Sequence, residues 1–131
     1  MGLLSDFLKS LGTRRTSRAK FTLLYRPGVE PALPVGHLEF DGTRWTFSYD
    51  QAYKQRADLR PLEGFDDLGR TYSSPVLFPF FAMRIPDRER PDIERILQAK
   101  RVSAPDAVDL LRLFGERAAS SPGFQLVQTP A

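Results

Sequence analysis

The chain has 131 residues, 41% of them hydrophobic, and it contains no cysteine. The formal net charge is +3, but residues 1–20 carry five basic side chains and one acidic, whereas residues 21–131 carry 14 basic and 15 acidic. The apolar content is sufficient for a hydrophobic core and excludes wholesale disorder. The nearly neutral body argues against a broad nucleic-acid-binding face and leaves only a basic N-terminal arm.

The composition also limits the cellular setting and the chemistry. Without cysteine there is no disulfide, no thiolate nucleophile and no thiolate metal site. No apolar run reaches the length of a membrane span, and Asp6 and Lys9 interrupt the N-terminal hydrophobic stretch, unlike in a secretory signal. We therefore expect a cytoplasmic protein with an amphipathic helix and basic linker in residues 1–20 and one domain over residues 21–131.

The N-terminal segment shows helical periodicity. Residues 3–11 place five apolar side chains on one helical face, namely Leu3, Leu4, Phe7, Leu8 and Leu11. A helix this short is marginal alone, and packing on its own domain is favoured over docking on a partner or a membrane surface. The polar linker that follows is favoured as a solvated tether, and its candidate contacts for an anionic partner are Arg14, Arg15, Arg18 and Lys20.

The clearest local prediction is a β-hairpin over residues 35–49, which follows an expected strand at 21–26 and a proline-rich loop at 27–34. In the first hairpin strand, Leu38 and Phe40 are expected on one face, and Val35, His37 and Glu39 on the other. Asp41 and Gly42 are expected to supply the positive φ angles of the turn. The return strand places three aromatic residues on one face, where Trp45 is expected in the core with Phe47 and Tyr49.

Residues 58–74 show little periodicity and predict a long loop, after a short helical turn that Asp50 caps. Long loops in compact domains often carry function. This loop offers exposed-looking aromatic and arginine side chains of the kind that interfaces favour, and we take as candidate partner-binding residues Phe65, Leu68, Arg70 and Tyr72. The alternative that these residues simply cover the sheet is equally favoured.

The C-terminal half predicts helices. Residues 75–83 are densely apolar, although Pro79 limits regular helix there. Helices are expected near 91–100 and 104–114, the second capped by Ser103 and ended by Gly115, and a final strand at 124–128. This order predicts an α+β fold with a small, mostly antiparallel sheet in which the hairpin 35–49 is central, and with both helices packed on that sheet.

No catalytic constellation is evident. His37 is the single histidine, no phosphate-binding glycine motif occurs, and no lysine has the strand context of a kinase ATP-binding lysine. An enzyme using Asp66, Asp67 or Ser73 is the weakest hypothesis, because no base or electrophile accompanies them. The two helices have helix-turn-helix spacing, but acidic residues begin the second, so packing is favoured over DNA reading. We expect no catalytic residue, metal or cofactor.

Four segments carry a family resemblance: Val35-Gly36-His37-Leu38, Trp45 to Asp50 with Tyr53, Pro79-Phe80-Phe81-Ala82 with Ile85-Pro86-Asp87, and Leu110 to Gly115. They resemble the N-terminal subdomain of the HipA-type Ser/Thr kinase toxins, whose pattern includes V-G-x-L, F-x-Y-D-x-x-Y and P-F-F-x-x-L-L-P-E-G. The resemblance covers roughly residues 21–128. The family's Leu-Leu-Pro-Glu-Gly is replaced here by Arg84-Ile85-Pro86-Asp87-Arg88, and its S-L-x-x-P segment by Arg60-Pro61-Leu62-Glu63-Gly64.

The resemblance implies a binding role. The chain stops where a full-length toxin begins its kinase core, so no ATP-binding or catalytic residue is carried over. A lone N-terminal subdomain resembles the small HipS-like component of the bacterial HipBST toxin–antitoxin systems. This implies a non-catalytic inhibitor of a Ser/Thr kinase toxin encoded nearby. The resemblance also allows a DNA-binding third component in the complex. The alternative is a nucleic-acid-associated accessory protein that uses the basic arm, although direct nucleic-acid binding is not expected.

Overall fold

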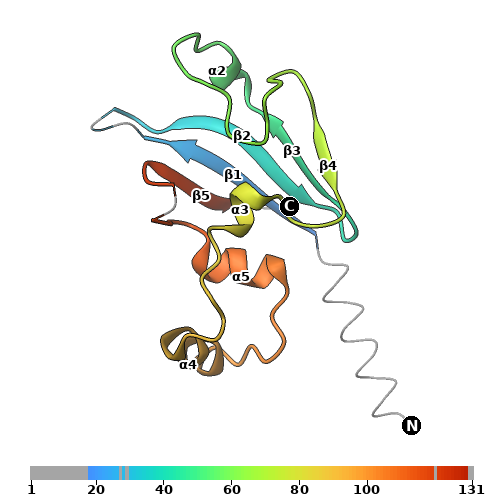
Figure 1. Cartoon of the computed structure of the whole chain (residues 1–131), viewed down its shortest axis with the longest axis vertical. Helices are drawn as coiled ribbons and strands as arrows, with labels where there is room; N and C mark the ends of the chain where they lie inside the picture. The colour runs from blue at the N-terminus through green and yellow to red at the C-terminus, as the bar shows by residue number, and fades with distance from the viewer. Residues whose placement is uncertain (1–17, 27, 29, 120, 130–131) are drawn as a thin grey trace.

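The computed structural model describes residues 18–26, 28, 30–119 and 121–129, in which five strands form one antiparallel sheet with the order β4-β3-β2-β1-β5 (Figure 1). The strands are β1 (Ala19–Tyr25), β2 (Leu33–Phe40), β3 (Trp45–Tyr49), β4 (Tyr72–Ser74) and β5 (Phe124–Thr129). The helices are α2 (Gln51–Lys54), α3 (Pro79–Ala82), α4 (Pro91–Ala99) and α5 (Ala107–Phe114). The predicted α+β class is confirmed, whereas the helix expected over residues 3–11 lies outside the described residues.

The predicted hairpin is present as β2 and β3, and all three aromatic residues of β3 are buried as expected. The turn differs from the prediction, because Gly42 has a φ of 106° but Asp41 does not have a positive φ. Asp41 instead stabilises the turn through its side chain, because its carboxylate accepts hydrogen bonds from the backbone N–H groups of Thr43 and Arg44, both at 2.8 Å. These bonds lower the pKa of Asp41 to about 2.

The start of β2 contains a β-bulge that the sequence pattern does not reveal. The register of β1 against β2 shifts between Leu23, which pairs with Gly36, and Leu24, which pairs with Pro34. Val35 therefore has no paired residue in β1. Val35 is therefore 0% exposed and lies in the core with Leu38, so the prediction that it faces opposite Leu38 is wrong. The bulge also admits Pro34 into a strand, where the sequence predicted a loop.

The glycine of the V-G-x-L segment has a packing reason. A Cβ on Gly36 would lie 2.6 Å from the carbonyl oxygen of Ser48 and would overlap the Phe47 ring. Only glycine lets the hairpin strands and this ring approach so closely.

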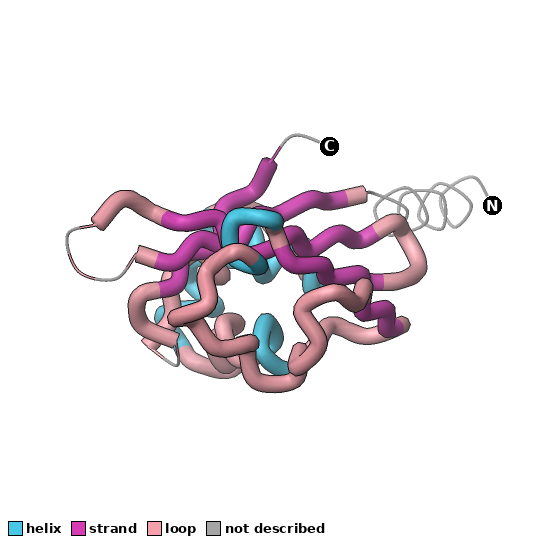
Figure 2. The backbone as a smooth tube through the Cα atoms, turned by 90° about the horizontal axis from the view of Figure 1, so that it is seen from above, coloured by secondary structure: helices cyan, strands magenta, loops and turns pink. Residues whose placement is uncertain are grey.

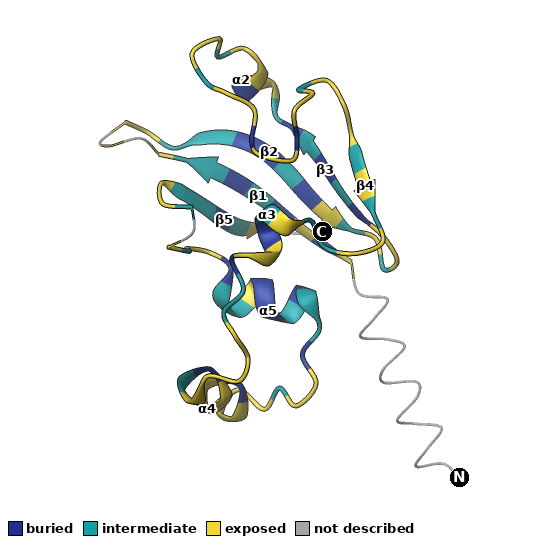
Figure 3. Cartoon of the chain, in the orientation of Figure 1, coloured by how far each residue is buried: buried dark blue, intermediate teal, exposed yellow. Residues whose placement is uncertain are grey.

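Loops and helices gather on one side of the sheet (Figure 2). There the buried side chains of β1, β2 and β3 meet those of the long loop, α3 and α5 in one core: Phe21, Leu23, Leu38, Phe47, Phe65, Phe81, Val108 and Leu111. Helix α4 lies farther from the sheet (Figure 3) and packs through Ile93 and Leu97 against Leu110 of α5. The sheet therefore supports α5, and α5 in turn supports α4.

Helix α5 begins later than the sequence predicts and ends where it predicts. Ser103 is not its cap, because the N-cap is Asp106, whose carboxylate accepts from Asp109 N–H at 2.9 Å while Asp109 accepts from Asp106 N–H at 3.2 Å. Because this reciprocal capping box satisfies the backbone N–H groups of Asp106 and Asp109, the helix begins after Asp106 and not before Pro105. Gly115 ends the helix as predicted.

The domain begins slightly earlier than residue 21. Ala19 is 1% exposed in the core and Lys20 lies in β1, so the predicted assignment of these two residues to the linker is wrong. Arg18 is exposed just before the strand, whereas Arg14 and Arg15 lie outside the described residues. Among the residues that the structure describes, no helix is long and apolar enough to cross a membrane.

Candidate interaction surface

The long loop folds back over the core instead of projecting from it. Phe65 is 2% exposed, and its ring centroid lies 4.5 Å from that of Phe47, 5.0 Å from that of Tyr72 and 5.1 Å from that of Phe78. The expectation that Phe65 is exposed is therefore wrong, because this large apolar ring gains more by joining the aromatic core than by facing water. Phe65 therefore packs against β3, β4 and the segment before α3.

Two tyrosines hold this loop in place. The Tyr49 hydroxyl donates to the Phe65 carbonyl at 2.6 Å and accepts from the Leu62 N–H at 2.8 Å, and the Tyr53 hydroxyl donates to the Arg60 carbonyl. Burial raises the pKa of Tyr49 to about 12, so its hydroxyl stays protonated at neutral pH. The backbone of residues 60–65 is thus fixed by buried hydrogen bonds.

The other three predicted contact residues lie together at the end of the loop. Leu68 packs partly buried against the core, and Tyr72 lies half-buried in β4. The guanidinium carbon of Arg70 is 5.2 Å from the centroid of the Tyr72 ring, a cation–π distance, and Arg70 itself is exposed. The Tyr72 hydroxyl accepts from the Asp67 N–H at 2.8 Å. An ordered aromatic and cationic surface results.

The acidic pair on this loop shows no metal-binding arrangement. Asp67 accepts a hydrogen bond from the Gly69 N–H at 2.9 Å and thus stabilises the turn. Across the part of the chain that the structure describes, no group of three His, Cys, Asp or Glu side chains is placed to hold a metal ion. His37 lies on the uncovered side of the sheet, where its Nε2 is 2.8 Å from Asp50 Oδ2.

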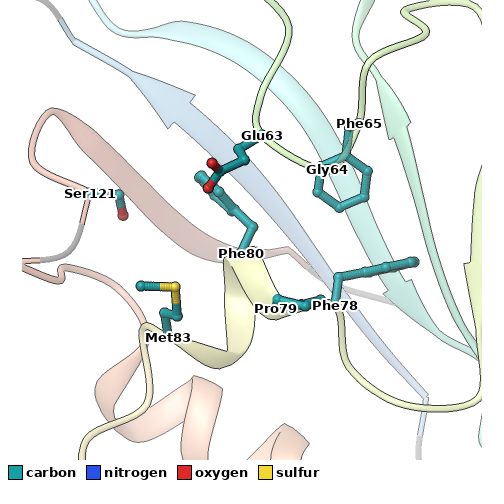
Figure 4. Close-up of a pocket in the computed structure, with 8 residues that line it drawn as sticks. All are labelled: Glu63, Gly64, Phe65, Phe78, Pro79, Phe80, Met83 and Ser121. Atoms are coloured by element: carbon teal, nitrogen blue, oxygen red, sulfur yellow. The ribbon is translucent and has the colours of Figure 1, made fainter.

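Sequence reasoning missed an apolar groove between the loop and α3. Its volume is about 260 Å³, and its lining comes from three segments (Figure 4): Glu63, Gly64, Phe65, Phe78, Pro79, Phe80, Met83 and Ser121. The single turn of α3 buries Phe81 and leaves Met83 65% exposed on the other side. The dense apolar run at 75–83 was the signal in the sequence for an apolar surface. Which of its side chains face outward depends on the position of the long loop, which the sequence does not show.

A buried arginine fixes α3 below this groove. Arg84 is the one charged side chain that is buried among the described residues, at 2% exposure, and burial lowers its pKa. Its guanidinium donates four hydrogen bonds, to Gly115 O at 2.7 Å, Glu116 O at 2.7 Å, Phe124 O at 3.2 Å and Ser121 Oγ at 2.6 Å. Arg84 therefore joins the end of α3 to the connection between α5 and β5.

The fold and this surface define a small α+β module with an ordered, partly apolar surface. A family model described as the HipA N-terminal domain matches residues 31–120. The match covers more than half of the chain, so the chain belongs to the HipA N-terminal domain family. Membership associates it with toxin–antitoxin systems, in which this domain is a non-catalytic subdomain. Neither the search of curated proteins nor that of solved structures gave a match.

Proposed function

We propose that this chain is a non-catalytic, antitoxin-like subunit that binds a HipA-type Ser/Thr kinase toxin encoded nearby and inhibits it in the bacterial cytoplasm. The observation that carries the proposal is the family match over residues 31–120, which spans β2 to the end of α5 and nearly all of the surface described above. In this role the chain supplies the N-terminal subdomain that its kinase partner lacks.

The proposed contact is the surface of the long loop and β4. Arg70 and Tyr72 combine a cation, an aromatic ring and a hydroxyl, which are the groups enriched at binding hot spots. Leu68, two residues before Arg70 in the chain, is partly buried against the core and adds apolar area. Because Tyr49 already holds the loop through two buried hydrogen bonds, little conformational entropy is lost when the partner binds. Phe65 contributes from within the core by supporting Tyr72.

Co-expression tests this proposal. The kinase alone should arrest growth, whereas the kinase with this chain should allow growth and should co-purify with it. Arg70→Glu should weaken the complex about tenfold by removing a central cation, while Arg112→Glu on the exposed face of α5 should leave it intact. Persistent arrest together with no purifiable complex would refute the proposal.

A further inference from the structure

The groove between the loop and α3 is small and mainly apolar, and it is large enough to hold one side chain. Pockets that hold cofactors or drug-sized ligands usually measure about 300–1,000 Å³. This groove measures about 260 Å³, and apart from Glu63, Gly64 and Ser121 its lining consists of aromatic residues, proline and methionine. A volume and lining of this kind suit one large apolar side chain of a protein partner.

The charge of the groove restricts the partner further. Glu63 is the one ionisable residue in the lining, and it forms no hydrogen bond or ion pair with any described residue. Arg84, just after α3, is buried and donates to backbone carbonyls and to the Ser121 hydroxyl at the groove, so its donors are already engaged. A cation beside the apolar side chain would therefore meet an unpaired carboxylate.

The groove is already ordered before any partner binds. Phe80, on one wall, lies edge-to-face against Phe81 at 5.1 Å and against Phe124 at 5.8 Å between ring centroids. Arg84 fixes the end of α3, and Tyr49 fixes Phe65 on the opposite wall. Met83 forms the exposed rim, and its unbranched thioether side chain adapts readily to an incoming group.

From this chemistry we infer that the groove receives one large apolar side chain of the kinase partner, flanked in the partner by a lysine or arginine that pairs with Glu63. The inference rests on the proposed function and adds a second contact region, separate from Arg70 and Tyr72, with a stated chemistry. A second copy of this chain is the rival occupant.

Two matched pairs of variants test the groove in the complex of the full chain with the kinase. Met83→Glu places a charge at the rim, and Val76→Glu does the same at an apolar residue outside the groove with nearly equal exposure, 68% against 65%. Affinity should fall at least tenfold for Met83→Glu and less than threefold for Val76→Glu, as measured by isothermal titration calorimetry. Circular dichroism melts of the free proteins confirm that both variants fold.

The second pair tests the charge. Glu63→Lys should weaken binding about tenfold and reduce its salt dependence, because a carboxylate–cation contact is lost. Glu39→Lys, on the uncovered side of the sheet, should change neither. If the wild type binds but Met83→Glu and Glu63→Lys bind equally well, the groove inference is wrong and the proposed function stands. If the wild type itself does not bind the kinase, the proposed function fails instead.

Measuring self-association tests whether a second copy of this chain occupies the groove. Light scattering should show the same mass for wild type and Met83→Glu in the absence of the kinase. A wild-type dimer that Met83→Glu converts to a monomer, with kinase affinity unchanged, would assign the groove to a second copy and overturn the inference.

Discussion

Replacing Arg84 with methionine removes the buried connection between α3 and the segment that leads from α5 to β5. Methionine matches the aliphatic part of arginine in length and has no donor, so the aliphatic packing is largely retained while all four hydrogen bonds are lost. Three of the acceptors are backbone carbonyls, which no side-chain change can remove. The substitution therefore leaves polar acceptors without their donor in a region that burial has largely closed to water.

The expected loss of stability follows from opposing contributions. Each buried acceptor left unpaired costs about 1–3 kcal/mol. Gly115 O, Phe124 O and Ser121 Oγ lose the arginine donor, whereas Glu116 O keeps the Leu126 N–H at 2.9 Å. Removing the buried charge offsets part of this cost, because burial already disfavours the charged form of Arg84 and lowers its pKa. Water entering the site satisfies some acceptors. The net free energy of unfolding should fall by about 3–5 kcal/mol, a large part of a typical domain's stability.

Urea denaturation followed by circular dichroism measures this loss. With a slope of roughly 1.5–2 kcal/mol per molar urea, the midpoint of Arg84→Met should fall by about 1.5–3 M. Arg95→Met, at an exposed position on α4, should stay within about 0.5 kcal/mol of wild type. Arg84→Lys should be intermediate, because an ammonium cannot span the four acceptors as the planar guanidinium does. A loss below 1 kcal/mol for Arg84→Met would refute the reasoning.

Three further predictions concern other parts of the chain. Arg101, with a φ of 60°, is the left-handed residue that ends α4, where its N–H donates to Gln98 O and the Val102 N–H donates to Leu97 O. Arg101→Gly should therefore stabilise the protein by about 0.5–1 kcal/mol and raise its melting temperature in calorimetry, and a lower melting temperature would contradict this. Because the fold raises the pKa of Tyr49 from 10.0 to about 12, the stability linked to its protonated hydroxyl should be complete below pH 10 and lost between pH 10 and 12. Urea denaturation over this range should show a steeper loss for wild type than for Tyr49→Phe, and equal slopes would argue against the assignment. Deleting residues 1–17 keeps Ala19 in the core, and neither this form nor the full chain should bind DNA in fluorescence anisotropy at low salt. Salt-sensitive binding that disappears on deletion would favour the nucleic-acid alternative.

Four of the five strands were predictable from sequence because their signals are local, whereas β4 (Tyr72–Ser74) lies at the end of the segment predicted to be a long loop. Alternating apolar residues and a turn glycine specify β2 and β3, and the aromatic face of β3 is buried as its spacing indicates. Val35 escaped this reasoning because the bulge depends on a register shift in β1, a different part of the chain. The cap of α5 was misplaced because Ser103 and Asp106 are both good caps, and only Asp106 finds a reciprocal partner in Asp109.

The candidate surface was predictable only in part. The long loop and its residues Arg70 and Tyr72 were recognised from composition, whereas Phe65 was misplaced because an aromatic residue in an aperiodic segment carries no periodicity to show which way it faces. Arg84 depends on contacts more than 30 positions away, such as Gly115, and the groove depends on how residues 63–65, 78–83 and 121 come together. Sequence reasoning treats an isolated arginine as exposed, so this buried contact left no local signal.

The most direct test of the central claim is the phosphorylation rate of the purified kinase partner as this chain is added. We expect the rate to fall in proportion to added chain and to approach zero at one chain per kinase. Under dilute conditions, where affinity limits binding, Met83→Glu should require about ten times more protein for the same effect. A rate that stays unchanged at saturating concentrations of wild-type chain would contradict the claim.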